Sequence, residues 1–117
     1  VPSATTLLGL LKHVTWTQRV WFEECIGGGT RVALGLVRSP AESFVVDDGD
    51  TIDGVIAAHR RACATARAVV ADVPLDAIVT GHHSGPRTVH WVYLQVLREL
   101  AHHCGHADIL REQILSS

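Results

Sequence analysis

The sequence predicts an all-α protein with the geometry of a four-helix bundle. Three long stretches carry apolar residues at steps of three and four, the period of one face of an α-helix. Glycine and proline, which interrupt helices, separate these stretches. The stretches are also well matched in length, roughly 33–42 Å at about 1.5 Å per residue, as expected for the rods of one bundle. We therefore expect residues 1–117 to form a single helical domain.

The first helix is predicted over residues 4–26. Ser3 or Thr5 is a suitable N-cap, because a side-chain hydroxyl accepts a hydrogen bond from the free N–H groups of the first turn. Three consecutive glycines, residues 27–29, end the helix, since glycine readily adopts left-handed backbone angles. The residues expected to face inward are Leu7, Leu10, Leu11, Val14, Trp21 and Phe22.

The second helix is predicted over residues 51–72, capped by Asp50 or Thr51 and closed by Pro74. Its expected inward residues are Ile52, Val55, Ile56, Cys63, Ala66 and Val70. Residues 30–49 join the first two helices, and a connection of this length in a small domain is often functional. The apolar run RVALGLV within it is predicted to be either a short strand or an extended segment along the bundle.

The third helix is predicted to begin after Gly85-Pro86, with Thr88 as its cap, and to continue to about residue 115. An irregular segment, residues 75–87, precedes it. Gly105 lies inside the helix and costs about 1 kcal/mol relative to alanine, so we expect a packing or functional reason for it.

Three amphipathic helices do not close well around one core. The chain begins with Val-Pro rather than Met, and the fourth rod of the bundle is expected either upstream of it or from a partner subunit.

The composition excludes several classes of protein. A hydrophobic content of 47% with 19% charged residues is typical of a soluble globular protein. The net charge is −2 and Lys and Arg form no block, so nucleic-acid binding is not expected. No apolar run approaches the roughly 20 residues of a membrane span. Three cysteines, an odd number, indicate free thiols in a reducing cytoplasm, and Cys25, Cys63 and Cys104 are interpreted as packing residues.

The sequence has 8 histidines, and three acid–base residues stand on the apolar face of the third helix. The inward residues there are Val92, Gln95, Val96, Glu99, His103, His106 and Leu110. Glu99 and His103 are four residues apart, so their side chains lie one above the other. Burying a carboxylate and an imidazole away from water is unfavourable unless each has a partner. One divalent ion bound to both side chains would supply that partner. The alternatives are a Glu–His hydrogen bond without a metal, or a solvated face.

A third ligand has to come from another helix. His13 is the best candidate, because it lies among Leu10, Leu11 and Val14, although a core histidine paired with a polar neighbour gives the same pattern. His102 and His106 form a competing pair, which with Asp108 also fits an exposed helix end. The other histidines are expected outside the site: His59 on the surface, His82 and His83 in a loop, and His90 in a structural role.

Three segments resemble those of a known family: TTLLGLLKHVTWTQRVWF, FVVDDGDTIDGVIAAHRRACA and VHWVYLQVLRELAHHCGHADILREQI. They resemble the DinB-like metalloprotein superfamily, and most closely its branch of mycothiol-dependent S-transferases, relatives of the mycothiol-dependent maleylpyruvate isomerases. The segments cover most of the chain in the family's order, and the last is the most specific.

The resemblance implies a four-helix bundle, often dimeric, that holds a divalent metal through three ligands. The matching positions are His13 in the first segment and the Glu99 and His103 pair in the last. His106 stands where many relatives carry glutamine, beside the metal, and is a candidate catalytic residue. His90 and His102 stand where relatives often carry arginine. Relatives usually have another helix before the His13 segment.

The resemblance also implies an activity. Three protein ligands leave open positions on a metal, as in catalytic sites, and zinc would bind a thiol as the thiolate. We therefore expect a cytoplasmic homodimer that activates a mycothiol-type thiol for attack on an electrophile. Zinc is the expected metal, with nickel and iron as alternatives. The competing interpretations are a metal-binding bundle without catalysis, such as a stress or resistance protein, and a dimeric structural domain without metal.

Overall fold

The protein is an all-α bundle, as predicted. The computed structural model describes residues 6–81 and 85–116. Its long helices are α1 (Leu7–Arg19), which continues directly as the π-helix η1 (Val20–Ile26), α3 (Ile52–Val70) and α4 (Val89–Ser116). A short helix, α2 (Pro40–Ser43), lies between α1 and α3. The strands β1 (Ile78–Val79) and β2 (Arg87–Thr88) form a small antiparallel pair in which Ile78 is opposite Thr88.

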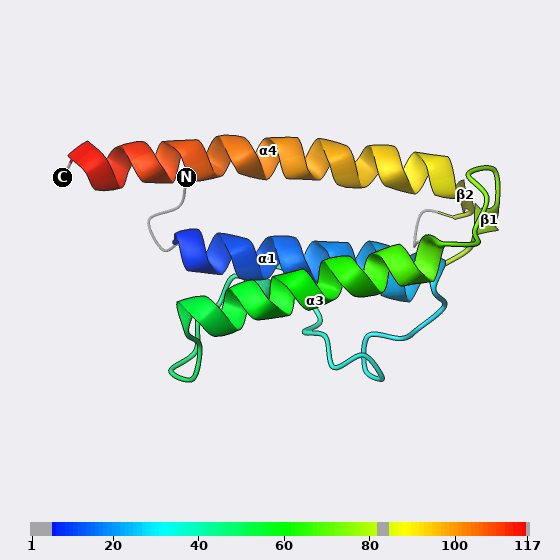
Figure 1. Ribbon diagram of the computed structural model, residues 1–117, viewed down its shortest axis with the longest axis horizontal. Helices are drawn as coiled ribbons and strands as arrows, with labels where there is room; N and C mark the ends of the chain where they lie inside the picture. Colours follow the sequence, from blue (N-terminus) through cyan, green and yellow to red (C-terminus); the bar gives the residue numbers. More distant parts are fainter. Residues whose placement is uncertain (1–5, 82–84, 117) are drawn as a thin grey trace.

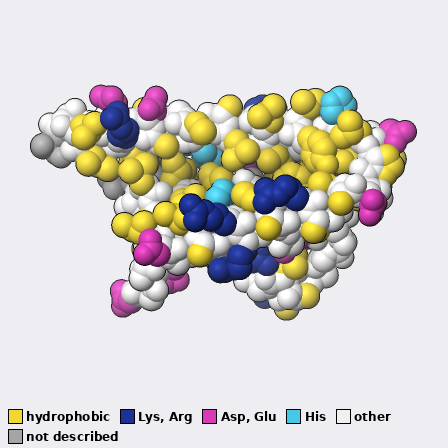
Figure 2. All heavy atoms as spheres, viewed as in Figure 1, with side chains coloured by type: hydrophobic (Ala, Val, Ile, Leu, Met, Phe, Trp, Pro, Cys, Tyr) yellow, Lys and Arg dark blue, Asp and Glu magenta, His cyan; other side chains and the backbone are white. Residues whose placement is uncertain are grey.

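The helix α1 lies at the centre of the bundle and packs against both α3 and α4. Figure 1 shows that α1 and α3 run in the same direction, whereas α4 runs antiparallel to both. A groove between α3 and α4 is visible in Figure 2 as a hollow lined by hydrophobic side chains. Among the described residues there are three long rods, and the fourth rod expected from the sequence stays a prediction.

The first helix begins later than predicted and changes type before it ends. Thr6 is its N-cap, and its hydroxyl accepts a hydrogen bond of 3.0 Å from the Gly9 N–H. The predicted caps Ser3 and Thr5 lie outside the described residues. From residue 20 the backbone is π-helical, a form that occurs often at functional sites. Gly28, with φ of 77°, supplies the left-handed backbone expected where the helix ends.

The other two long helices begin at the predicted N-terminal caps. Thr51 accepts from the Gly54 N–H at 3.0 Å, and Thr88 accepts from the Trp91 N–H at 3.0 Å. Two residues expected inside are exposed instead, because each lies in the first turn of its helix, beyond the packed part of the bundle. Leu7 is 41% exposed and Ile52 is 67% exposed.

The main hydrophobic core lies where η1 meets the first half of α4. Trp21, Cys25, Val92 and Val96 form its centre. The Trp21 and Trp91 rings meet edge to face with centroids 5.7 Å apart, a favourable geometry for aromatic pairs. Cys25 is a buried packing residue, as predicted. On α1, the candidate ligand His13 lies about two turns before Trp21. On α4, the candidate ligands Glu99 and His103 lie about one to two turns after Val96.

The connection between α1 and α3 differs from both predictions. The run RVALGLV forms turns over residues 31–35 and is neither a strand nor an extended segment. The sequence analysis also missed α2, although its start carries a recognisable signal. Ser39 accepts a hydrogen bond from the Glu42 N–H at 3.3 Å, and Pro40 occupies the first helical position, where proline is tolerated because its missing N–H is not needed.

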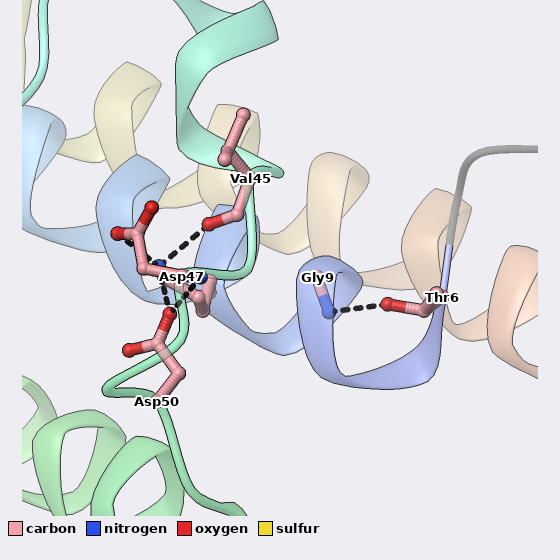
Figure 3. Close-up of polar contacts among 6 residues, drawn as sticks. Thr6, Gly9, Val45, Asp47 and Asp50 are labelled. Carbon is pink, nitrogen blue, oxygen red and sulfur yellow. Dashed lines mark hydrogen bonds and ion pairs between the residues drawn. The ribbon is translucent and has the colours of Figure 1, made fainter.

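A lysine on α1 fixes the chain that leaves α2. Lys12 Nζ donates to the Val45 carbonyl and to Asp50 Oδ2, both at 2.6 Å. Figure 3 shows the Val45 carbonyl and the carboxylates of Asp47 and Asp50 gathered beside α1. The hydrogen bond from Lys12 lowers the pKa of the Asp50 carboxyl. These contacts hold the segment after α2 against α1.

The helix α1 and the end of α2 approach so closely that only glycine fits at residue 9. A Cβ at Gly9 would lie 2.5 Å from the Phe44 carbonyl oxygen, closer than real Cβ contacts allow. Gly105 differs, because a Cβ there would have no neighbour within 4 Å. The described chain therefore offers no packing reason for Gly105.

This contrast predicts opposite effects for two alanine substitutions. Gly9→Ala should lower the free energy of unfolding by about 1–3 kcal/mol, because the new methyl group must push the backbone of residue 44 away. Gly105→Ala should raise it by up to about 1 kcal/mol, because alanine is the better helix former and meets no obstacle. Chemical denaturation of the metal-free variants measures both. Equal effects of the two substitutions would contradict the close approach.

Candidate metal centre

His13 on α1 is held in place by the short helix α2 and the residue after it. The side chain is only 7% exposed. The Phe44 ring stacks on the imidazole with a centroid separation of 4.0 Å and an angle of 10°. On the edge of the ring, His13 Nδ1 lies 2.7 Å from Ser43 Oγ. The stacking therefore fixes the plane of the imidazole ring, and the contact with Ser43 fixes its rotation within that plane.

The hydrogen bonds of Ser43 decide which nitrogen of His13 carries the proton. The Ser43 hydroxyl donates its only hydrogen to the Pro40 carbonyl oxygen, so its oxygen can only accept from His13. His13 Nδ1 must therefore be protonated, which leaves the lone pair on Nε2. Partners of this kind, which fix the tautomer of a histidine through its other nitrogen, are a regular feature of metal sites.

The lone pair of His13 points at the histidine that the sequence analysis paired with it. His13 Nε2 lies 3.1 Å from His103 Nε2, which comes from α4. Two nitrogens that each bind one zinc ion at about 2.0–2.1 Å are roughly 2.9 Å apart at a right angle and roughly 3.3 Å apart at the tetrahedral angle. The observed separation falls between these values, so the two imidazoles fit a shared ion. The structure thus brings together two of the three predicted ligands.

His106 lies beside His103, one helical turn further along α4. The Nδ1 atoms of the two rings are 3.4 Å apart, so one of them donates and the other accepts. When His103 Nε2 is free of a proton, His103 Nδ1 carries it and donates to His106. When His103 Nε2 donates to His13, the direction of the His106 contact reverses. The direction of the hydrogen bond between His106 and His103 therefore depends on whether His103 Nε2 carries a proton.

Glu99 borders the same cavity as His13 and His103 but is turned towards its own helix. Its Oε1 accepts a hydrogen bond of 3.2 Å from Gln95 Nε2, and Arg98 in turn donates to Gln95 Oε1. Among the described residues, no three His, Cys, Asp or Glu side chains are grouped closely enough to hold an ion as they stand. The carboxylate would have to leave Gln95 to become a ligand.

A cavity of about 980 Å³ opens beside the two imidazoles, large enough for a small molecule. The connections on either side of α3 both contribute to it, through Arg31, Pro40 and Gly81. The remaining lining residues come from α1, η1 and α4: His13, Trp16, Thr17, Val20, Trp21, Glu24, Cys25, Gln95, Arg98, Glu99, His102 and His103. The cavity therefore combines aromatic walls with charges of both signs.

Burial keeps the central histidines neutral. Desolvation, with smaller contributions from His103 and His106, lowers the pKa of His13 from 6.5 to about 4. Burial is also the main cause that lowers the pKa of His103, with His106 and His102 acting in the same direction and Glu99 opposing them. Neutral imidazole is the form that binds metals, so both side chains are ready to act as ligands at neutral pH.

The structure corrects some predictions about individual histidines and cysteines and confirms others. Cys104, interpreted as a packing residue, is exposed, because it lies on the outer face of α4. His59 is half-buried between α1 and α3 and is not a surface residue. His102 is exposed, as expected for a peripheral residue. His90, which was expected in a structural role, is exposed as well. The two loop histidines, His82 and His83, lie outside the described residues.

The sequence analysis missed the two residues that hold His13 most closely, Ser43 and Phe44. The SPAE sequence at residues 39–42 combines a capping serine, a proline and a glutamate, and this signal predicts a helix start just before them. Nothing in the sequence indicates that this short helix packs beside His13, which is 30 residues earlier.

The comparison with protein families places the chain in a family without testing the individual site residues. A family model described as Mycothiol-S-transferase matches residues 1–115. The chain belongs to the mycothiol-S-transferase family. Searches of curated proteins and of solved structures give no match. Among the described residues of this mycothiol-S-transferase family member, no helix is both long and apolar enough to span a bilayer.

The pKa of His13 predicts how the stability of the metal-free protein depends on pH. The unfolded chain protonates His13 near pH 6.5, whereas the folded chain does so only near pH 4. Protons therefore favour the unfolded state, and the free energy of unfolding should decrease as the pH falls from about 6.5 to about 4. Chemical denaturation across this range should show a shallower decrease for His13→Gln. The control His90→Gln, at an exposed position, should keep the wild-type slope.

Proposed function

We propose that the protein is a metal-dependent thiol S-transferase. In this proposal His13, Glu99 and His103 hold one divalent ion, zinc in the first place, and a mycothiol-type thiol is activated for attack on an electrophile in the adjoining cavity. The observation that carries the proposal is the 3.1 Å separation of the two Nε2 atoms, one of which has its lone pair fixed by Ser43. The family membership supports the transferase class.

The residues of the chain have separate roles in this proposal. When bound, the metal would supply the positive charge that lowers the pKa of a thiol. Ser43 keeps the His13 Nε2 lone pair directed at the site. With a metal on His103 Nε2, His106 would accept a hydrogen bond from His103 Nδ1 and thereby orient that ring. Trp16 and Trp21 line the cavity and exclude water, and its opening leaves room for two reactants.

The carboxylate ligand is the part of the site that must rearrange. Glu99 now accepts from Gln95, and Gln95 also accepts from Arg98. A turn of the Glu99 side chain away from Gln95 would bring its charge towards the imidazoles. Two histidines and one carboxylate also suit nickel or iron, which remain the alternative metals. The expected homodimer and the cytoplasmic location likewise stay predictions.

Substitution of His103 tests the proposed ligand set. His103→Ala should weaken zinc binding by at least about 100-fold, since it removes a ligand and leaves His13 without its partner. The control is His90→Ala, because His90 lies on the same helix but is exposed and is not among the residues that line the cavity. Isothermal titration of chelator-treated protein measures both affinities. Equal zinc binding by the wild type and His103→Ala would sink the assignment.

The same three proteins test the activity. The zinc-loaded wild type and His90→Ala should consume a generic electrophile faster when a low-molecular-weight thiol is present, whereas His103→Ala should not. Zinc binding without thiol-dependent turnover would instead favour a metal-binding bundle without catalysis. No zinc binding at all would favour a structural domain.

Substitution of Ser43 tests the fixed tautomer of His13. Ser43→Ala should weaken zinc binding by about 10–100-fold, because His13 then loses the acceptor that keeps the proton on Nδ1. The control is Ser39→Ala, which removes the hydroxyl at the other end of α2 without touching His13. If both variants bind zinc with the same affinity, the role of Ser43 as the acceptor for His13 is wrong.

A further inference from the structure

A second cluster of chemically active side chains lies between α1 and α3. It consists of Thr15 on α1 and of His59 and Cys63, which are four residues apart on α3. Thr15 Oγ1 lies 3.0 Å from His59 Nδ1, and His59 Nε2 lies 3.5 Å from Cys63 Sγ. None of the three lines the cavity beside His13 and His103. The proposed transferase mechanism therefore leaves this cluster without a role.

The hydrogen bonds of Thr15 fix the proton on His59. The Thr15 hydroxyl donates its hydrogen to the Leu11 carbonyl oxygen at 2.8 Å, so it can only accept from His59 Nδ1. The lone pair of His59 is therefore on Nε2, the atom that faces the thiol. Burial lowers the pKa of His59, so the ring is neutral at neutral pH and its Nε2 lone pair can accept a hydrogen bond from the thiol.

The thiol of Cys63 has two possible acceptors for its single proton. The sulfur donates to Gln18 Oε1 at 3.4 Å, and His59 Nε2 lies at a similar distance on another side. Rotation of the S–H bond alone transfers the hydrogen bond from Gln18 to His59. A nucleophile, a base beside it and a third group that orients the base are the three parts of an activated thiol site.

Cys63 is also accessible and lies in a positively charged environment. It lines the groove between α3 and α4, a hollow of about 320 Å³ whose other walls include Phe22, Tyr93 and Leu100. Arg60 and Arg67, three residues before and four residues after Cys63, lie on the same face of α3 and are exposed. Neither forms an ion pair with any described residue. Figure 2 shows Lys and Arg side chains along α3 on the side towards α4.

We propose that Cys63 is a nucleophilic thiol that exchanges with small anionic disulfides. His59 Nε2 takes the proton of Cys63, and the thiolate attacks one sulfur of the disulfide. A new disulfide bond joins Cys63 to that sulfur, the original disulfide bond breaks, and the released thiolate takes the proton from His59. The arginines attract the negative charge of the reagent. The product is a mixed disulfide in the groove.

The position of Cys63 favours disulfide exchange over acyl transfer. Cys63 lies in the interior of α3, where the backbone N–H groups are already bonded within the helix. Acyl transfer needs donors positioned at the oxygen on which charge develops, and the backbone of α3 around Cys63 offers none. Thiolate attack on a disulfide needs only access and a good leaving group.

The exposed cysteine on α4 provides the control that tests the proposal. Cys104→Ser leaves Cys63 as the reactive thiol, and Cys63→Ser leaves the more exposed Cys104. The release of nitrothiobenzoate from the anionic reagent dithiobis(nitrobenzoate) at neutral pH should be at least about tenfold faster for Cys104→Ser than for Cys63→Ser. Mass mapping of briefly treated wild-type protein should find the label on Cys63, which tests the proposal even if a variant fails to fold. Preferential labelling of Cys104 would overturn the proposal.

Further variants in the Cys104→Ser background separate the roles. His59→Gln and Thr15→Val should each slow the reaction by about tenfold, whereas Thr15→Ser should restore it, because it keeps the hydroxyl. The double variant Arg60→Gln/Arg67→Gln should slow the anionic reagent but not the cationic disulfide cystamine. An unchanged rate in His59→Gln would contradict the role of the base, and an equal effect on both reagents would contradict the charge selection.

Discussion

The hydrogen bond between His13 and Ser43 is the interaction on which the rest of the candidate metal centre depends. An imidazole among leucines is costly to bury unless its polar atoms are satisfied. Ser43 satisfies Nδ1 and, because its own hydrogen is given to Pro40, leaves Nε2 as the only free lone pair. This single contact therefore makes burial tolerable and also determines which atom faces His103.

Several neighbouring contacts keep Ser43 in position. The missing side chain at Gly9 allows the backbone after α2 to touch α1. Lys12 binds the same segment through a carbonyl and a carboxylate. Phe44 follows Ser43 directly and covers the imidazole face. Because these contacts act on one short segment, the geometry of the site and the packing of the connection cannot change independently.

The helices could be predicted from the sequence, and so could the shared helix face of Glu99 and His103, because both depend on local spacing. The apolar period locates α1, α3 and α4, and the four-residue step places Glu99 and His103 on one face. The role of Ser43 could not be predicted, because it depends on a contact across 30 residues through a segment without periodicity. The π-helical turn, the orientation of Glu99 towards Gln95 and the pairing of His59 with Thr15 also follow from tertiary packing. Cys104 was misjudged because helical position alone does not tell which face a neighbour covers.

The parallel arrangement of α1 and α3 determines how long the connection between them has to be. Two neighbouring helices that run in the same direction cannot be joined by a tight turn, so the chain after η1 must travel back along the whole bundle (Figure 1). That return path is what carries α2 past the middle of α1. A topology with antiparallel neighbours would enclose a similar hydrophobic core with a much shorter linker, but it would bring no hydroxyl to His13. The long connection is thus part of the candidate metal centre, because it brings the hydroxyl of Ser43 to His13.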